Sequence, residues 1–304
     1  MSTGKKIAII IAAALMGLGI LCSTAAAVLL GFDFTKLNAA DLSDKTYEIH
    51  ESFDSIDIYE TEYTIRLQPS EDGVAKVTCR ESEDNGHTVT VENGTLKITR
   101  TDRRKWYEYI GIFWANDTTL TLHLPQSQYK TLSAQSVSGY LIVPEAFTFE
   151  SATLCSTSGD IFCYAQVKDS FSATSISGEV VLKNQTGGTL TASTTSGDLH
   201  LFDICVSSIA LTTTSGDIEC NAVIADGQLQ MEAVSGNVEL NKCDGGSLQI
   251  KTVSGDIIGT LRSGKWFITN TTSGDIRVPT SHKDGGNCAL TTTSGDIKIA
   301  LLTV

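Results

Sequence analysis

Apolar and polar residues alternate along most of this chain in short stretches that return with a fixed long period. A Ser-Gly pair recurs nine times in phase, from Ser138-Gly139 to Ser294-Gly295, and successive glycines lie 19 to 21 residues apart. A fixed period of this length is typical of a solenoid, in which each repeat forms one coil stacked on the previous one. The pattern therefore predicts about nine regular coils.

Each repeat contains two strand-like stretches around the Ser-Gly corner. The second and fourth positions after the glycine are mostly apolar and the third is mixed, as in Ile218-Glu219-Cys220. The seventh and fifth positions before the glycine are also mostly apolar, as Leu248 and Ile250 show. This alternation of period two predicts short strands with one buried face. Glycine is expected at the corner because it can adopt the positive φ that a bend requires.

The predicted fold is all-β, a single β-solenoid (β-helix) over residues 47–304. Residues 131–304 form its regular coils, and residues 47–130 form an irregular β part that covers one end. Within that part, Asp72-Gly73 and Asn93-Gly94 each lie between strand-like runs, which predicts two tight hairpins.

The N-terminal residues 1–30 predict one transmembrane helix. Ile7 to Leu30 contains no charged residue and would span roughly 36 Å as a helix, enough to cross a bilayer. Lys5 and Lys6 place the N-terminus in the cytoplasm and the body outside the cell, after a polar spacer at 31–46. Two alternatives remain: a cleaved signal peptide, which would make the protein secreted, and a lipid-modified cysteine.

The net charge and the distribution of acidic residues and histidines limit the kinds of partner and ligand that the chain is expected to bind. The formal net charge of −13 argues against nucleic acid as a partner. An acidic residue follows most corner glycines, as in Asp198, Asp217 and Asp256. We interpret this column as turn chemistry, in which Asp accepts a backbone hydrogen bond, rather than as a calcium ladder, because one carboxylate per coil supplies too few oxygens. The five histidines show no spacing that indicates a site, so no cofactor or metal is expected.

One segment interrupts the β pattern with aromatic and basic residues. It is expected either to cap the solenoid or to contact a membrane or an anionic envelope polymer. The candidate binding residues are Arg103, Arg104, Lys105, Trp106, Tyr107, Tyr109 and Trp114.

The last strand-like run, residues 296–302, ends close to Val304 with no covering segment after it. Because an uncovered edge strand offers unpaired backbone groups, this strand is expected to pair with a second copy of the chain or with a partner protein.

Three motifs follow one another in the body of the chain: FDSIDI at 53–58, LTLHLP at 120–125 and the serial Ser-Gly-Asp-Ile corners. Their order and period resemble the bacterial putative-adhesin family of unknown function, over about residues 50–304. The resemblance implies a β-helical surface domain, often membrane-anchored and in some bacteria linked to envelope-stress systems, and it supplies no catalytic residues.

The predicted function is that of a non-catalytic, membrane-anchored, extracytoplasmic protein that binds an envelope or surface component. Two alternatives remain: a β-helical enzyme acting on acidic polysaccharides, and a sensory ectodomain working with a membrane partner.

Overall fold

The computed structural model describes residues 3–29, 42–82, 84–103 and 118–302 and divides into two compact units. In the first unit, which comprises Met1–Leu42 and Arg103–Asn116, the described secondary structure is helix α1 (Thr3–Leu29). Among the described residues, no helix combines the length and the apolar character that crossing a membrane requires.

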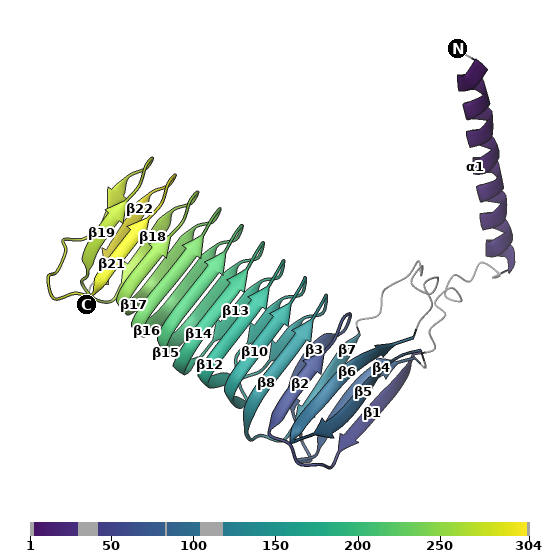
Figure 1. The fold of residues 1–304 in the computed structure, drawn as a ribbon, viewed down its shortest axis with the longest axis horizontal. Helices are drawn as coiled ribbons and strands as arrows, with labels where there is room; N and C mark the ends of the chain where they lie inside the picture. The colour runs from purple at the N-terminus through teal and green to yellow at the C-terminus, as the bar shows by residue number, and fades with distance from the viewer. Residues whose placement is uncertain (1–2, 30–41, 83, 104–117, 303–304) are drawn as a thin grey trace. The chain divides into compact units, whose positions relative to one another are not determined.

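The second unit, Ser43–Asp102 and Asp117–Val304, is all-β, and its strands form one continuous hydrogen-bonded system (Figure 1). The strands before the regular coils are β1 (Ser43–Ile49), β2 (Ser55–Tyr59), β3 (Thr64–Pro69), β4 (Ala75–Glu81), β5 (Asn85–Glu92), β6 (Thr95–Asp102) and β7 (Thr119–Leu124). Those of the regular coils are β8 (Gln128–Ser136), β9 (Leu141–Val143), β10 (Thr148–Ser156), β11 (Ile161–Cys163), β12 (Gln166–Ser175), β13 (Val180–Lys183), β14 (Thr186–Thr194), β15 (Leu199–Thr213), β16 (Ile218–Ala233) and β17 (Val238–Lys251). The C-terminal end contains β18 (Ile257–Leu261), β19 (Trp266–Asn270), β20 (Ile276–Arg277), β21 (Asn287–Thr291) and β22 (Ile297–Leu301).

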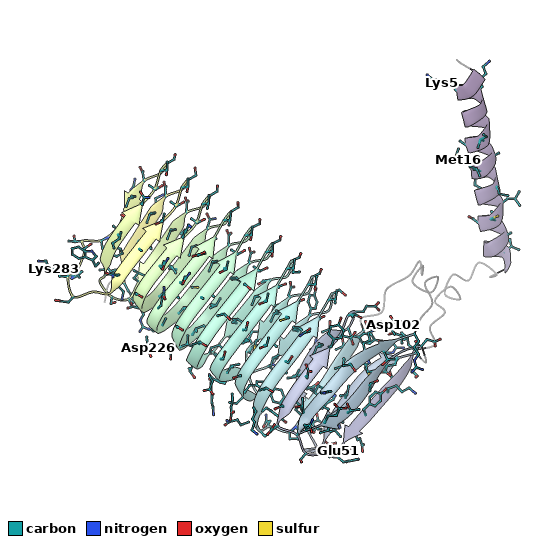
Figure 2. All side chains as sticks on the ribbon, viewed as in Figure 1. Lys5, Met16, Glu51, Asp102, Asp226 and Lys283 are labelled. Carbon is teal, nitrogen blue, oxygen red and sulfur yellow. The ribbon has the colours of Figure 1, made fainter. Side chains whose placement is uncertain are left out.

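Successive coils pair in parallel and in register, which confirms the predicted β-solenoid of about nine turns. The residues predicted to face inward lie on top of one another, as Leu199, Ile218 and Val238 do, and their side chains are fully buried. Figure 2 shows side chains lining both surfaces of these stacked strands. The alternation of period two thus places one continuous apolar core along the axis of this unit.

The corner glycine is required by contact between coils and not by its own backbone angles, so the predicted reason for it is wrong. Among the nine corners only Gly274 has a φ in the left-handed region, at +153°. A Cβ added at Gly159, Gly178 or Gly197 would lie 2.1 Å from the carbonyl oxygen of the glycine in the preceding coil. The backbones approach so closely there that no side chain fits.

The left-handed bend lies instead at a second corner, six residues after the glycine. Asn184, Asp203, Ala222 and Lys242 occupy this position in four successive coils, with φ between 54° and 57°. None of them is glycine, so the sequence gives no visible sign of this bend. After this bend β15 and β16 remain paired in two further short segments, and these segments complete the coil.

Two columns of polar side chains tie the glycine corners together. Thr213 Oγ1 donates a hydrogen bond to the carbonyl oxygen of Gly197, and Thr252 Oγ1 to that of Gly236, each one coil away. Asp198 Oδ1 accepts the backbone N–H of Asp217 in the next coil at 2.8 Å. The acidic column therefore serves turn chemistry, as predicted, and five of its carboxylates accept a backbone N–H of an adjacent coil, namely Asp160, Asp198, Asp217, Asp256 and Asp296.

At both ends of the solenoid the coils do not stack in sequence order. The strands β21 and β22 lie between β17–β18 on one side and β19–β20 on the other. At the opposite end β2 and β3 lie between β6–β7 and β8–β9. In Figure 1 the segment labelled β19 is accordingly outermost at the yellow-green end.

This arrangement corrects the prediction that residues 296–302 form an open edge. Strand β22 is paired on both sides, and the edge is formed by β19 and β20, where Trp266, Ile268 and Ile276 are exposed. The segment after β20 partly covers that edge, because the N–H of His282 donates to the carbonyl oxygen of Lys265. Self-association stays a prediction, and it would now involve β19 and β20.

The N-terminal end carries antiparallel strands, and β1 begins at Ser43, inside residues 31–46 that were predicted to be a spacer. Strand β1 pairs with β4, β4 with β7, and β5 with β6. Asn93 and Gly94 form the predicted tight hairpin between β5 and β6, with φ of 51° and 76°. Asp72-Gly73 does not form one, because β7 lies between β3 and β4.

Replacing Gly197 with Ala tests the contact between coils. The new methyl group would collide with the carbonyl of Gly178, so we expect a loss of roughly 3 kcal/mol or more in unfolding free energy, by overpacking. The matched control is Gly227→Ala. An added Cβ there would lie 3.0 Å from one backbone oxygen, that of Ser207, and the φ of Gly227 is outside the left-handed region. Urea denaturation of both variants measures the difference, and equal stabilities would contradict the assignment.

Candidate functional site

A group of outward-facing side chains lies on four successive coils after the glycine corner, with rings on three of these coils, whereas the β13 coil contributes the buried Val181 and Lys183. We call this group the aromatic face, and it comprises Tyr140, Ile142, Phe162, Tyr164, Val181, Lys183, His200 and Phe202. Strands β9, β11, β13 and β15 carry it, and their parallel register stacks Ile142, Phe162, Val181 and His200 in one column. The inward neighbours of these residues are fully buried, which fixes the strands that present the face.

The rings of the aromatic face contact one another along the axis of the coils. The centroids of Tyr140 and Phe162 are 6.3 Å apart in an edge-to-face arrangement. Lys183 Nζ lies 5.5 Å from the ring centroid of Tyr164 and 5.0 Å from that of Phe202. Such ring pairs and cation–π contacts hold side chains in place without burying them completely.

Polar groups border the rings at one side of the face. His200 stacks on Phe202 with a centroid distance of 6.4 Å, and its Nδ1 lies 3.0 Å from Glu219. Its Nε2 lies 3.4 Å from Glu179 on the other side. The face thus combines flat apolar surfaces with hydrogen-bonding carboxylates, an arrangement that can contact a ligand with both apolar and polar groups.

The sequence prediction missed the aromatic face because it considered one outward column at a time. The third position after the glycine contains Phe162 and His200 among charged residues and was interpreted as mixed. The fifth position contains Tyr164, Lys183 and Phe202 in consecutive repeats. Only the two columns together show that aromatic residues gather on neighbouring coils.

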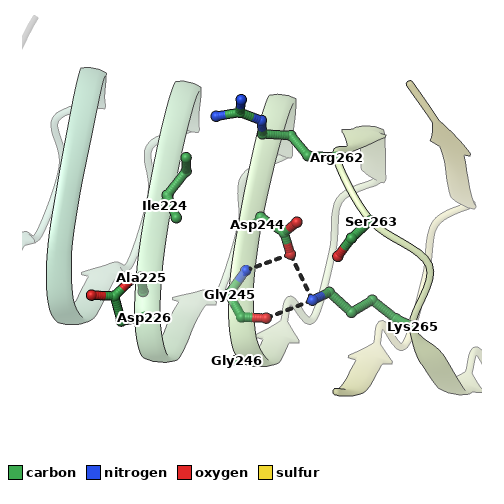
Figure 3. A pocket seen from close by; sticks show the side chains of 9 residues that line it. All are labelled: Ile224, Ala225, Asp226, Asp244, Gly245, Gly246, Arg262, Ser263 and Lys265. Carbon is green, nitrogen blue, oxygen red and sulfur yellow. Dashed lines mark hydrogen bonds and ion pairs between the residues drawn. The ribbon is translucent and has the colours of Figure 1, made fainter. Parts of the chain in front are cut away.

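A second candidate is an open depression of about 420 Å³ on the regular coils (Figure 3). Its lining includes Asp226, Asp244, Arg262 and Lys265. Lys265 is buried, and its Nζ lies 2.6 Å from both Asp244 Oδ1 and the carbonyl oxygen of Gly245. The buried ammonium group of Lys265 is therefore already paired, so a ligand in this depression would contact mainly the residues at its rim.

A third candidate is a buried group of charged side chains in the N-terminal strands, which we call the acid–histidine cluster. It comprises Tyr47, Glu60, Cys79, Glu81, His87 and Arg100. His87 Nε2 lies 2.5 Å from Glu60 Oε2, and its Nδ1 lies 2.6 Å from Glu81 Oε1. The prediction that no histidine belongs to a site overlooked this one, since Glu60, Glu81 and His87 share no regular spacing.

The charges of the cluster sustain one another. Burial alone would lower the pKa of His87, but Glu60 and Glu81 raise it above its ordinary value. Burial would likewise raise the pKa of Glu60, yet His87 and the N–H groups of Thr61 and Glu62 lower it. Arg100 completes the cluster with hydrogen bonds to Glu60 Oε1 at 3.1 Å and Glu62 Oε2 at 2.7 Å. A buried charge is tolerated when it is paired in this way.

The cluster arises where the corner column changes its chemistry. In the regular coils the position three residues before the glycine holds Ser or Thr, with Ala233 as the exception, and Ser136 is the first of these in the sequence. Its counterpart in the adjacent β2–β3 coil is Glu60, whose Oε1 accepts the N–H of Thr61 at 2.7 Å and of Glu62 at 3.1 Å. In the next coil the same position is Arg100. A carboxylate thus replaces a hydroxyl as the acceptor of the corner, and an arginine neutralises it.

Of the binding residues predicted from the sequence, Arg103 is exposed. The others, Arg104, Lys105, Trp106, Tyr107, Tyr109 and Trp114, lie outside the described residues, so the contact site stays a prediction.

Removing the partner of Lys265 tests the buried ion pair of the depression. Asp244→Ala should cost on the order of 3 kcal/mol in unfolding free energy, because it leaves a buried ammonium group without its carboxylate. Lys265→Met should cost less, since Asp244 keeps the N–H of Gly245 as a donor. Equal losses in thermal or urea unfolding would contradict this ranking.

The same pair predicts a pH dependence. Burial would raise the pKa of Asp244, but hydrogen bonds from Lys265, Ser263 and the Gly245 N–H lower it below its ordinary value. Its contribution is therefore present above the unfolded pKa of about 3.9 and is lost as pH falls through the lowered folded pKa. The stability difference between the native protein and Asp244→Ala should shrink below about pH 4, and a constant difference down to pH 2 would oppose this assignment.

Comparisons with known proteins place these features in a family. The chain is similar to a crystal structure described as a "putative lipid binding protein" from Parabacteroides distasonis, with 17% identity, a TM-score of 0.53, and coverage of 86% of this chain and 98% of that one. It is also similar to a "putative adhesin" from the same organism, with 11% identity, a TM-score of 0.52, and the same coverage of 86% and 98%. At these identities the likeness shows a shared fold. No curated protein sequence matches the chain significantly.

A sequence profile described as Toastrack DUF4097 matches residues 53–257, from the segment FDSIDI through the corner at Gly255. The match includes most of the regular coils, the aromatic face and, except for Tyr47, the acid–histidine cluster. Since it covers more than half of the chain, and as the resemblance of its motifs predicted, the protein belongs to the Toastrack family of unknown function.

Proposed function

We propose that this protein is a non-catalytic, extracytoplasmic binding protein whose aromatic face holds a linear, neutral glycan of the cell envelope or surface. The observation that carries the proposal is the group of partly exposed rings on the β9, β11 and β15 coils, held by the Tyr140–Phe162 and Lys183–Phe202 contacts. Sugar rings present flat C–H surfaces between hydroxyl groups, and those surfaces pack on the faces of aromatic rings.

The repeat of the coils favours a polymer over a small ligand. Parallel strands place like residues about 4.8 Å apart, so the rings of the β9, β11 and β15 coils lie at multiples of that step along the axis, with Lys183 between the last two. An extended polysaccharide advances by a comparable distance for each sugar. Open, flat faces of this kind also suit long ligands that gain affinity from several weak contacts.

Charge favours a neutral glycan over an acidic one. The chain has a formal net charge of −13, and Glu179 and Glu219 flank His200 at the border of the face. An anionic polymer would be repelled by these carboxylates, whereas sugar hydroxyls would donate hydrogen bonds to them. The solved structures described as a lipid-binding protein and an adhesin support a binding role, without pointing to one ligand.

The test is binding of the purified full-length protein to immobilised oligosaccharides. The neutral panel contains cellohexaose, chitohexaose, xylohexaose and maltohexaose, and the acidic panel contains polygalacturonate and hyaluronan. We expect binding to at least one neutral member. Phe162→Ala and Phe202→Ala should each weaken it about tenfold, which corresponds to roughly 1.4 kcal/mol.

The matched control is Gln249→Ala, because Gln249 is exposed on β17 away from the aromatic face. It should leave binding unchanged, and melting temperatures should show that all three variants fold. Preference for the acidic panel, or neutral binding that neither Phe variant affects, would contradict the proposal. New reducing or unsaturated ends in the same incubation would show an enzyme instead.

Membrane attachment through the N-terminal segment is a separate proposal. It rests on the absence of charged residues from Ile7 to Leu30 in the sequence, next to Lys5 and Lys6. We expect the protein to sediment with membranes and to resist extraction by high salt and alkaline carbonate, since hydrophobic insertion does not depend on charge. A double substitution, Ile10→Lys with Leu15→Lys, should release it, and a protein extracted by carbonate alone would refute attachment by insertion.

A further inference from the structure

The acid–histidine cluster brings three different metal-ligating atoms together at the N-terminal end of the solenoid. Cys79 Sγ and Glu81 Oε1 come from β4, and His87 Nδ1 comes from β5. Glu81 Oε1 lies 2.9 Å from Cys79 Sγ and 2.6 Å from His87 Nδ1, and the sulfur and nitrogen are 3.7 Å apart. The three residues are buried, and their ligand atoms all lie within 4.8 Å of one another.

We propose that Cys79, Glu81 and His87 bind a divalent transition-metal ion of the zinc type. A thiolate, a carboxylate and an imidazole form the mixed sulfur, oxygen and nitrogen set that Zn²⁺ takes in proteins, whereas Ca²⁺ and Mg²⁺ require oxygen ligands. At ordinary bond lengths, two ligands of a tetrahedral zinc ion are roughly 3.2–3.7 Å apart. The sulfur–nitrogen distance already meets this range, and the Glu81 oxygen would have to withdraw by about 0.5–1 Å.

Glu60 provides the second observation that points to a metal. Metal-binding histidines commonly donate the other ring N–H to a carboxylate, which fixes the ring and the nitrogen that faces the ion. Here Glu60 Oε2 accepts His87 Nε2 at 2.5 Å, so Nδ1 is directed at Cys79 and Glu81. Tyr63 packs edge to face against His87 with ring centroids 5.1 Å apart, and this contact also restricts rotation of the imidazole.

The carboxylate ligand is supported in the same manner. Tyr47 donates a hydrogen bond from its hydroxyl to Glu81 Oε2 at 2.8 Å, which leaves Oε1 for the ion. Glu60 in turn is held by Arg100 and by the backbone of the corner. Glu81 and His87 are therefore both oriented by hydrogen bonds from neighbouring side chains, and the ion would require only a small displacement of the Glu81 oxygen.

The charge of the cluster accommodates the ion. Zn²⁺ binding would release the thiol proton of Cys79, because the thiolate is the form that coordinates the ion. The thiolate and the carboxylates of Glu60 and Glu81 would then offset the charge of the ion. The remaining coordination position would be filled by water, since Tyr47 holds the second oxygen of Glu81.

The structural consequence would be a link between strands that share no ladder. Strand β4 pairs with β1 and β7, and β5 pairs with β6. Between β4 and β5, the described pairing is the single bridge from Ser82 to Asn85. A metal held by Cys79, Glu81 and His87 would join β4, which pairs with β1 and β7, to the β5–β6 pair at this end of the solenoid.

Cobalt provides a direct test with the full-length protein. After removal of metal with EDTA and dialysis, Co²⁺ should bind one ion per chain and produce the near-ultraviolet thiolate-to-cobalt band together with visible bands of a tetrahedral site. Zn²⁺ should displace it and bleach both sets of bands. The melting temperature should rise when Zn²⁺ is added, because the ion binds the folded state only.

Cys79→Ser and His87→Gln should each remove the thiolate band and lower Zn²⁺ affinity at least tenfold. The matched control is Cys163→Ser, a buried thiol of β11 in the regular coils, which should keep both. Should His87→Gln fail to fold, the nearly isosteric Cys79→Ser still decides, since far-ultraviolet circular dichroism reports its fold. A folded native protein without the cobalt band, or an unchanged band in Cys79→Ser, would overturn the proposal and leave the cluster as an internal ion pair. This result does not depend on whether the aromatic face binds a glycan.

Discussion

The close contact between successive Ser-Gly corners sets the geometry of the whole solenoid. At Gly159, Gly178 and Gly197 the backbone of one coil lies directly on the carbonyl of the previous one, with no space for a Cβ. This contact lets the flanking strands reach hydrogen-bonding distance in register on both sides of the corner. The Thr and Asp ladders at the corner can form only because the coils are this close. Both the buried core and the outward columns inherit their spacing from it.

The regular coils were predictable because single residues show both the repeat and the alternation of inward apolar and outward positions. Ile218 and Cys220 face inward, and Glu219 between them faces outward, as period two requires. The reason for the glycine was not predictable in the same way, since a positive φ and a close approach both select glycine. The bend at Asp203 and Lys242 was hidden because residues without a common chemistry adopt the left-handed conformation there.

The candidate sites depend on which coils are neighbours, and the repeat does not encode that. Ser273-Gly274 and Ser294-Gly295 look alike, yet the later corner lies between the coils of Gly255 and Gly274. Likewise, nothing in the sequence indicates that Glu60 stacks on Ser136, or that Arg100 follows Glu60. The acid–histidine cluster exists because β2–β3 lies out of order, and its members come from separate strands with no common spacing. The aromatic face, which uses coils in sequence order, was within reach of the sequence.

Strands β21 and β22 lie between two coils that precede them in the sequence, and this has a consequence for the order of folding. The coil of β19 and β20 has no strand to pair with until residues 287–301 are available, because its ladder partners are β21 and β22. During synthesis or export, assembly from the N-terminal side can proceed coil by coil only as far as β18. The last two coils must then form together, with the later one entering between its predecessors. That end of the solenoid is therefore assembled as one cooperative step, whereas the regular coils can be added individually.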